Sequence, residues 1–278
     1  MARKQTVKDI LLKKGGEKKI SMLTAYDAPM AMLLDQSGID ILLVGDSLGM
    51  VVLGLDSTVP VTMDQMLHHA TAVSRGAKSA LVVGDMPFGS YLVDPRDTVR
   101  NGLRFLKEAG CDAVKLEGGR DACADVEALV RAGVPVMGHL GLTPQTAGQL
   151  GGFKVQGKSF EAGRKLLADA RALEKAGAFA LVLECVPGRL AEVITRGIGI
   201  PTIGIGAGPH CDGQVLVTND MLGLFEKFTP GFVKKYLNLA PQLKEAVAAF
   251  QDEINSGVFP ASEHTFGTDE DFSALLKG

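Results

Sequence analysis

The strongest constraint on the fold is a pattern that recurs along the chain. In each copy a glycine ends a helical stretch, a short link follows, and a run of Val, Ile and Leu leads into polar residues or glycine. Glycine suits the position just after a helix because it adopts the left-handed conformation without strain. The apolar runs are continuous rather than alternating, which is typical of parallel strands buried on both faces. The glycines of the six copies are Gly38, Gly76, Gly110, Gly133, Gly177 and Gly197.

We predict eight strands separated by helices. The strands cover residues 21–24, 41–45, 80–84, 113–117, 136–138, 180–184, 201–205 and 214–218. The helices cover residues 28–37, 63–75, 95–109, 122–132, 159–176 and 187–196. Thr62 with Gln65, and Asp94 before Pro95, are helix-start signals for two of them. Strands that alternate with helices predict a (β/α)8 barrel, and an open doubly wound sheet is the alternative.

One domain is enough to account for the whole chain. Its 278 residues fit a single barrel of this class, which is about 250 residues long. We therefore predict one barrel domain over residues 1–278. Within it, residues 1–19 form an N-terminal segment whose short helix at 6–14 plugs a barrel end. Residues 230–278 form a C-terminal tail that is helical to 257 and polar from 262.

Composition and charge exclude several classes of partner. The formal net charge of -3 offers no basic surface to nucleic acid or to a membrane. No apolar run approaches the ~18 residues that a membrane helix needs. The four cysteines are widely spaced and no secretory signal is recognisable, so we expect reduced thiols and a cytoplasmic location. The expected ligand is a small molecule.

The carboxyl ends of barrel strands line the active site, so polar residues there are candidates for function. The carboxylates Asp46, Asp85, Glu117 and Glu184 would repel one another on one rim unless a cation lay among them. Oxygen ligands dominate and no His or Cys metal motif occurs, which favours Mg²⁺ over zinc. The predicted strand ends carry Thr24, Tyr26, Asp27, Asp46, Ser47, Asp85, Lys115, Glu117, His139 and Glu184.

A 2-oxo acid would suit such a metal, because its carboxylate and ketone oxygens can chelate the ion. Chelation makes the carbon next to the ketone acidic, since the metal stabilises the enolate charge, and a base is then required. Glu184 lies in the apolar run 181–186, where desolvation is expected to raise its pKa towards neutrality, the direction that a general base needs. The alternative for Glu184 is a buried carboxylate that pairs with a nearby cation.

Lys115 and Glu117 lie two residues apart on a predicted strand, so their side chains share one face. Lys115 is expected to stabilise the enolate or the substrate carboxylate, or alternatively to form a structural ion pair with Glu117. His139 could act as a proton donor, as a ligand contact or as a hydrogen-bonded rim histidine. The glycine-rich loop 204–208 could hold phosphate, but no Lys-Ser/Thr follows it and close packing is favoured.

Six motifs, taken in order, resemble those of the ketopantoate hydroxymethyltransferase family. The resemblance covers nearly the whole chain and leaves out only the polar C-terminal end. It implies a (β/α)8 TIM barrel of the phosphoenolpyruvate/pyruvate type with extra N- and C-terminal helices, assembled as a homodecamer of two pentameric rings. The motifs are Leu23-Thr-Ala-Tyr-Asp27, Leu43-Val-Gly-Asp-Ser-Leu48, Asp85-Met-Pro-Phe-Gly-Ser-Tyr91, Val114-Lys-Leu-Glu-Gly-Gly119, Gly138-His-Leu-Gly-Leu-Thr-Pro-Gln145 and Pro201-Thr-Ile-Gly-Ile-Gly-Ala-Gly208.

The resemblance also implies a reaction. 5,10-Methylenetetrahydrofolate is expected to donate a one-carbon unit to 3-methyl-2-oxobutanoate, giving 2-dehydropantoate for pantothenate and coenzyme A biosynthesis. Glu184 matches the proton acceptor of the family, and His139 lies in a family motif without a clear role. The implied Mg²⁺ ligands are Asp46, Asp85 and Glu117, the last of them directly or through water. The implied contacts to the oxo acid are Asp46, Ser47, Asp85 and Lys115.

Two other functions compete with this one. A carbon–carbon lyase or phosphonomutase of the same barrel type would also use Mg²⁺ and a 2-oxo acid. Such enzymes typically carry a catalytic cysteine in a Lys-Lys-Cys-Gly loop, and this motif does not occur in the sequence. A barrel that only binds a metabolite or a partner is the second competitor, and it leaves the charges at the rim unexplained.

Overall fold

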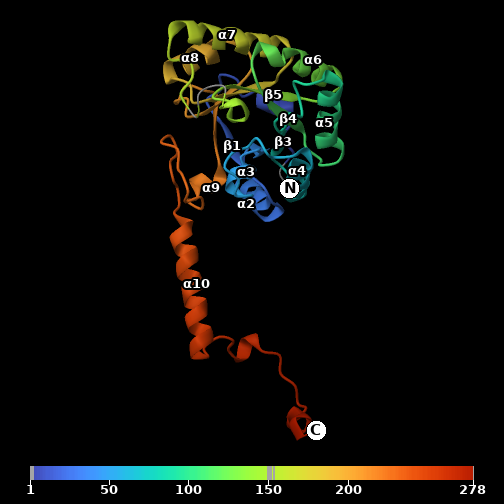
Figure 1. Ribbon diagram of the computed structural model, residues 1–278, viewed down its shortest axis with the longest axis vertical. Helices are drawn as coiled ribbons and strands as arrows, with labels where there is room; N and C mark the ends of the chain where they lie inside the picture. Colours follow the sequence, from blue (N-terminus) through green and yellow to red (C-terminus); the bar gives the residue numbers. More distant parts are fainter. Residues whose placement is uncertain (1–2, 149–151, 153, 278) are drawn as a thin grey trace.

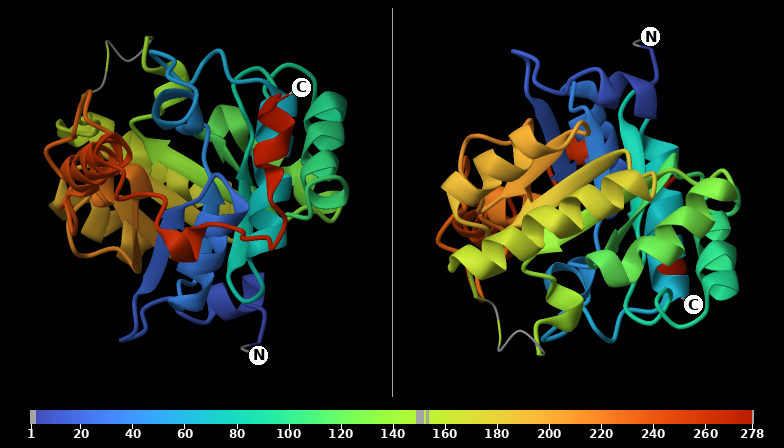
Figure 2. Two further views of the ribbon diagram at one scale, coloured as in Figure 1. Left: turned by 90° about the horizontal axis from the view of Figure 1, so that it is seen from below. Right: turned by 90° about the horizontal axis from the view of Figure 1, so that it is seen from above.

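A computed structural model describes residues 3–148, 152 and 154–277. Eight parallel strands close into a barrel in the order β1 to β8, and helices surround it (Figures 1 and 2). The predicted (β/α)8 barrel is confirmed, and the open sheet is excluded because β1 pairs with β8. The strands are β1 (Ile20–Thr24), β2 (Ile41–Val44), β3 (Leu81–Asp85), β4 (Ala113–Glu117), β5 (Val136–Gly141), β6 (Ala180–Glu184), β7 (Thr202–Ile205) and β8 (Gly213–Leu216).

All six predicted helices are present with ends that shift by a few residues. They are α2 (Ala28–Gln36), α4 (Met63–Gly76), α5 (Pro95–Lys107), α6 (Cys123–Arg131), α7 (Phe160–Lys175) and α8 (Gly188–Gly197). The connection from β7 to β8 spans residues 206–212, all of them described, and contains no helix. Short helices that we did not predict are α3 (Leu48–Val51), α9 (Thr218–Met221), η1 (Arg120–Ala122) and η2 (Pro144–Thr146).

The predicted helix-start signals form as expected. The side-chain oxygen of Thr62 accepts from the Gln65 N–H, and the Gln65 side chain accepts from the Thr62 N–H, which makes a capping box at α4. Asp94 accepts from the Arg96 N–H at the start of α5. These bonds satisfy backbone donors that have no partner inside the helix. The caps therefore fix the residues at which α4 and α5 begin.

Two apolar layers hold the barrel together. The inner layer contains side chains such as Ile20, Met22 and Ile41, and a larger layer lies between the strands and the helices. Gly84 in β3 permits close packing in the outer layer, because a Cβ added there would lie 2.3 Å from the Phe105 ring of α5. The glycine before Asp85 is thus explained by packing as well as by the turn that follows.

The N-terminal helix is shorter than predicted and closes one end of the barrel. Helix α1 covers only Val7–Leu11, because the chain continues in tighter turns and then reverses at Gly15, whose φ is +65°. Ile10 is fully buried and packs in the inner layer with Ile20 and Met22. Ile10 therefore fills the barrel interior as predicted, whereas Leu11 and Leu12, which the sequence placed on the same apolar face, are exposed.

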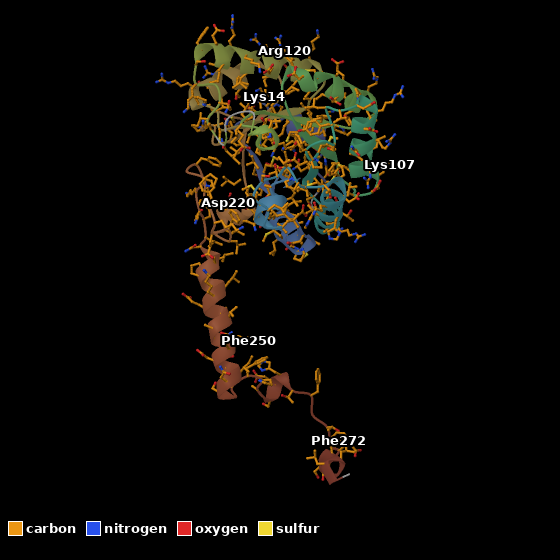
Figure 3. All side chains as sticks on the ribbon, in the orientation of Figure 1. Lys14, Lys107, Arg120, Asp220, Phe250 and Phe272 are labelled. Carbon is orange, nitrogen blue, oxygen red and sulfur yellow. The ribbon has the colours of Figure 1, made fainter. Side chains whose placement is uncertain are left out.

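The C-terminal helix begins later than predicted and projects from the barrel. Helix α10 covers Leu239–Ser256 rather than starting at residue 230. Residues 222–238 fold back on α9 instead, with hydrogen bonds from the Tyr236 N–H to the Met221 C=O and from the Leu239 N–H to the Leu222 C=O. Figure 1 shows α10 extending away from the barrel, and Figure 3 shows Phe250 on this projection. The polar end forms only short 3₁₀ turns, η3 (Ser262–His264) and η4 (Phe272–Lys277).

Two strand ends also differ from the prediction. Strand β5 continues to Gly141, where it pairs with Glu184 of β6, so His139 lies within the strand rather than after it. Strand β8 ends at Leu216, because Thr218 already begins α9. In the part of the chain that the structure describes, no helix is both long and apolar enough to cross a membrane.

Candidate active site

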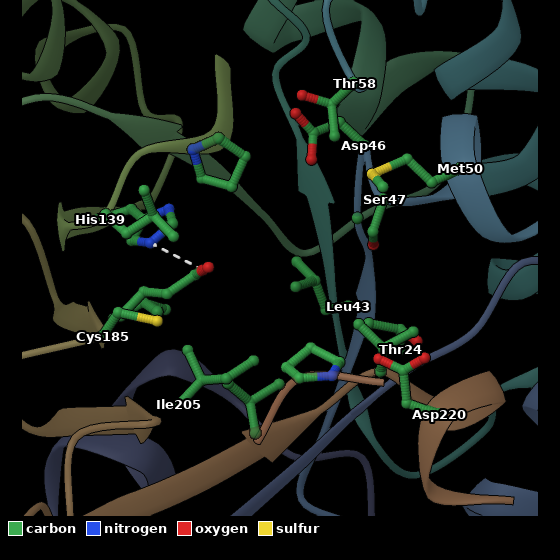
Figure 4. A pocket seen from close by; sticks show the side chains of 18 of the residues that line it. Thr24, Leu43, Asp46, Ser47, Met50, Thr58, His139, Cys185, Ile205 and Asp220 are labelled. Carbon is green, nitrogen blue, oxygen red and sulfur yellow. Dashed lines mark ion pairs between the residues drawn. The ribbon is translucent and has the colours of Figure 1, made fainter. Parts of the chain in front are cut away.

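A cavity of about 580 Å³ lies at the carboxyl ends of the strands and brings the predicted residues together (Figure 4). Its walls include every predicted catalytic, substrate and metal residue, although these come from five different strands or the loops after them. Asp27 lies outside it, because its exposed side chain caps α2 by accepting from the Met30 N–H. The residues that line it include Asp46, Ser47, Asp85, Lys115, Glu117, His139 and Glu184.

Lys115 and Asp85 form a buried ion pair across β3 and β4. The Lys115 Nζ donates to the Asp85 Oδ1 at 2.6 Å, and both side chains are almost inaccessible to solvent. Burial raises the pKa of Asp85 to about 7, although the charge of Lys115 opposes the shift. Burial lowers the pKa of Lys115, but the carboxylates of Asp85, Glu117 and Asp46 outweigh it and the net shift is upward. The lysine therefore stays charged, and its partner is Asp85 rather than the Glu117 of the alternative prediction.

His139 stands between two carboxylates. Its Nδ1 lies 3.4 Å from the Glu117 Oε1 and its Nε2 lies 3.3 Å from the Glu184 Oε2. Burial and Lys115 lower the pKa of His139, but the two carboxylates outweigh them and raise it to about 9. Burial raises the pKa of Glu117, and His139 and Lys115 only partly oppose this shift. His139 is thus a buried cation that links Glu117 to Glu184.

The backbone around Glu184 is tightly constrained. Gly141 has a φ of +99°, and a Cβ there would lie 2.1 Å from the Glu184 C=O, so only glycine allows β5 to approach β6 this closely. Cys185, which follows Glu184, has a φ of +49° although it is not glycine. Its N–H donates to the Ile205 C=O at 2.9 Å, which holds this strained conformation in place. The carboxylate of Glu184 is therefore aimed into the cavity by fixed backbone on both sides.

Gln145 connects the carboxylates, and the sequence reasoning assigned it no role. Its Nε2 donates to the Asp46 Oδ2 at 2.9 Å and to the Met86 C=O at 3.0 Å. Its Oε1 accepts from the Tyr91 hydroxyl at 2.6 Å, and its backbone N–H donates to the Glu117 Oε2 at 3.1 Å. The only sequence signal was its position at the end of a quoted motif. Gln145 orients Asp46 and Glu117 together.

The substrate side of the cavity is also held by hydrogen bonds. The hydroxyl groups of Tyr26 and Ser47 lie 2.9 Å apart, which fixes the Ser47 side chain beside Asp46. The Asp46 N–H donates to the Asp85 Oδ2 at 3.3 Å, so the two Gly-Asp motifs meet. Of the glycine-rich loop 204–208, only Ile205 lines the cavity. Its packing role is consistent with the sequence interpretation.

The residues present fit Mg²⁺ through a few ligands rather than a closed cage. Among the described residues, no group of three or more His, Cys, Asp or Glu is arranged to hold a metal ion. Mg²⁺ commonly binds one or two carboxylates and keeps waters or substrate oxygens at its other positions. Asp46 and Asp85 lie side by side, and the buried Glu117 Oε1 has no hydrogen-bond partner. Asp46 and Asp85 are therefore candidates for direct ligands, with Glu117 acting through water.

Comparison with known proteins shows the family of this chain. The family model for ketopantoate hydroxymethyltransferase matches residues 4–262. The chain belongs to the ketopantoate hydroxymethyltransferase family. It is 64% identical over 275 residues to the 3-methyl-2-oxobutanoate hydroxymethyltransferase of Desulfotalea psychrophila, covering 99% of each chain. It is 57% identical to that of Heliobacterium modesticaldum, covering 99% of this chain and 100% of the other. The prediction that this protein is an enzyme of the hydroxymethyltransferase class is confirmed.

Solved structures of other enzymes share the barrel. A phosphonopyruvate hydrolase superposes with a TM-score of 0.60 at 12% identity, over 98% of this chain and 95% of the other. A 2,3-dimethylmalate lyase of the PEP mutase/isocitrate lyase superfamily superposes with a TM-score of 0.56 at 16% identity, over 98% and 93%. These likenesses confirm the predicted (β/α)8 fold. At such low identity they carry no information about the reaction.

Proposed function

We propose that this enzyme transfers a hydroxymethyl unit from 5,10-methylenetetrahydrofolate to 3-methyl-2-oxobutanoate with the help of Mg²⁺, forming 2-dehydropantoate. The observation that carries the proposal is the convergence of Asp46, Ser47, Lys115 and Glu184 on one cavity, in a chain of this family. The product would enter pantothenate and coenzyme A biosynthesis. The cytoplasmic location stays a prediction.

The inner end of the cavity suits a small oxo acid. Mg²⁺ held by Asp46 and Asp85 would polarise the ketone and acidify the C3 proton. Lys115 supplies a fixed cation beside these carboxylates, where negative charge develops on the acid. Ser47 offers a hydroxyl whose position Tyr26 fixes. These groups bind and orient the acid before any bond changes.

Glu184 is the group placed to remove the C3 proton. The Nε2 of His139 lies 3.3 Å from the Glu184 Oε2 and holds this side chain in place. Water replaces both folate nitrogens at the methylene carbon, which releases tetrahydrofolate and leaves a one-carbon unit at the oxidation level of formaldehyde. The C3 carbanion adds to the carbonyl carbon of this unit, and its oxygen takes up a proton to become the product hydroxyl. His139 is a positioning residue in this scheme, because it acts through Glu184.

Proton exchange tests the role of Glu184 without the folate. The protein in D₂O with Mg²⁺ and 3-methyl-2-oxobutanoate is expected to exchange the C3 proton for deuterium, which NMR follows directly. Glu184→Gln is expected to lose this exchange, whereas the surface variant Glu161→Gln keeps it, since Glu161 is exposed on α7. Exchange at the normal rate in Glu184→Gln would exclude it as the base.

We also infer that the chain forms a homo-oligomer, with a decamer implied by family likeness. The support is helix α10, which carries exposed apolar side chains at helical spacing. Their exposures are 55% for Leu243, 56% for Val247, 51% for Phe250 and 48% for Ile254. Such a face is unfavourable in water and fits contact with another copy. Light scattering would measure the mass, and a monomer would contradict the inference.

A lyase or phosphonomutase reaction is not favoured by any feature of the cavity. The likeness to such enzymes is one of fold alone. The Lys-Lys-Cys-Gly motif typical of them does not occur in the sequence. Release of tetrahydrofolate when the protein, the oxo acid and methylenetetrahydrofolate are mixed would discriminate between the two reactions, because only the transfer consumes the folate.

A further inference from the structure

Asp220 is a buried carboxylate in the active-site cavity that the mechanism above does not use. It belongs to α9, directly after β8, and only 7% of its surface is exposed. The Thr218 N–H donates to the Thr24 Oγ1 at 3.0 Å, which fastens α9 to β1. Figure 4 shows Asp220 beside Thr24, across the cavity from His139. Asp220 is thus held rigidly on the wall opposite the proposed base.

The carboxylate of Asp220 has no partner. Neither oxygen accepts a hydrogen bond, and no cation lies within ion-pair distance, among the residues that the structure describes. Burial raises the pKa of Asp220 to about 6, and the more distant Lys235 opposes the shift only in part. An unpaired buried carboxylate is costly and rare, so it calls for an explanation. A ligand with hydrogen-bond donors would provide one.

The wall next to Asp220 is aromatic. Phe225, Phe228 and Phe232, from the segment that follows α9, line the same cavity. Phe232 packs against loop 204–208, because a Cβ added to Gly206 would lie 2.8 Å from its ring. Phe228 remains 64% exposed, which is unusual for a large apolar side chain beside a cavity. Flat aromatic ligands stack favourably on such rings.

Asp220 also adjoins the residues proposed for the oxo acid. Its charge raises the pKa of Tyr26, in addition to the larger effect of burial, and the Tyr26 hydroxyl contacts Ser47 at 2.9 Å. A cavity of about 580 Å³ is also far larger than a five-carbon acid needs. The outer part therefore has room for a second ligand next to the first.

We propose that Asp220 and the three phenylalanines form the subsite for the pterin ring of the folate, an assignment that rests on the proposed function. A 2-amino-4-oxopyrimidine ring presents two parallel N–H donors, from its ring nitrogen and its amino group, which match the two oxygens of a carboxylate. The bicyclic ring system stacks on the phenylalanines. Guanine carries the same donor pair, so the experiment must distinguish the two.

Binding and half-reactions separate the roles. The proteins to compare are the wild type, Asp220→Asn, Phe228→Ala and, as a matched control, Asp64→Asn, whose side chain is 85% exposed on α4. Titration calorimetry would use 6-methyltetrahydropterin, guanosine and p-aminobenzoylglutamate as probes. We expect a tenfold to hundredfold weaker affinity of Asp220→Asn for the tetrahydropterin, since hydrogen bonds to a charged group are lost. Phe228→Ala should weaken it several-fold.

The remaining outcomes decide the proposal. Asp220→Asn should bind p-aminobenzoylglutamate normally and should keep the C3 proton exchange of the oxo acid, which also shows that it is folded. An unchanged affinity of Asp220→Asn for the tetrahydropterin, or wild-type binding of guanosine in preference to it, would overturn the subsite. Loss of exchange in Asp220→Asn would instead place Asp220 at the oxo acid. A wild type without exchange or transfer would refute the proposed function itself.

Discussion

The contribution of the Gln145–Asp46 hydrogen bond to stability can be tested by replacing the amide of Gln145 with a carboxylate. Gln145→Glu keeps the shape of the side chain but replaces the amide donor with a second carboxylate, 2.9 Å from the Asp46 Oδ2. The hydrogen bond from the Tyr91 hydroxyl is retained, because a carboxylate accepts as the amide oxygen does. The variant therefore tests charge at this point with little change in packing.

The structure sets the size of the effect. Two negative charges about 3 Å apart repel by roughly 6 kcal/mol at an effective dielectric constant of 20. A proton can relieve this repulsion, and neutralising a glutamate of ordinary pKa at pH 7 costs about 4 kcal/mol. Protonation costs less than the repulsion, so its cost sets the upper limit of the destabilisation. Gln145→Glu should therefore lower the free energy of unfolding by up to about 4 kcal/mol at pH 7.

The direction in which the stability of Gln145→Glu changes with pH is the critical observation. The introduced carboxyl has a raised pKa in the folded state, so the loss of stability is present at pH 7 and shrinks as the pH falls towards 4. Urea unfolding at pH 7 and pH 5, at one protein concentration and without metal, measures it. Gln251→Glu is the matched control, because Gln251 is exposed on α10. Equal stability of Gln145→Glu and the wild type at both pH values would refute the role of Gln145.

Three further predictions concern the barrel and its site. Lys115→Met should lower the free energy of unfolding by about 3–5 kcal/mol, because Asp85 is left buried without its cation. The rate of C3 proton exchange in this variant should fall at least a hundredfold. Because the pKa of His139 is raised to about 9 in the folded protein, its protonation stabilises the fold fully below pH 6.5. About 3 kcal/mol of this stabilisation should be lost as the pH rises through 9. Urea unfolding of His139→Gln should show no such loss. Gly84→Ala should lower the free energy of unfolding, measured by urea unfolding, by about 1–3 kcal/mol, since its methyl group would overlap the Phe105 ring.

The positions of the strands could be predicted because the signal for them is local. Each apolar run after a helix-ending glycine became a strand, and only the ends shifted. The end of β5 was wrong because His139 and Gly141 do not look like strand residues, yet β6 pairs with them through Val182 and Glu184. The start of α10 was wrong because residues 222–238 hydrogen-bond to α9, a contact that no local pattern indicates.

The site residues on strands could be predicted for a similar reason, and those in loops could not. Asp46, Lys115 and Glu184 stand at strand ends, where the barrel geometry decides that they meet. Gln145 and Asp220 lie beyond the strands, in 3₁₀ turn η2 and helix α9. Their importance comes from burial and from contacts over long sequence separations, such as the 99 residues between Gln145 and Asp46. Neither residue belongs to a hydrophobic repeat or a motif spacing that could be recognised in the sequence alone.

The charge balance of the cavity explains why a cation was predictable but its partners were not. Four carboxylates at the strand ends pointed to a bound cation, because like charges repel in a buried site. The structure adds that Lys115 and His139 are cations within the same group, with His139 between Glu117 and Glu184. With Asp220, which lines the same cavity, five acidic side chains face these two basic ones, so the acidic groups remain in excess. The two protein cations therefore do not balance the acidic groups, so the proposed Mg²⁺ is compatible with a cavity that already holds Lys115 and His139.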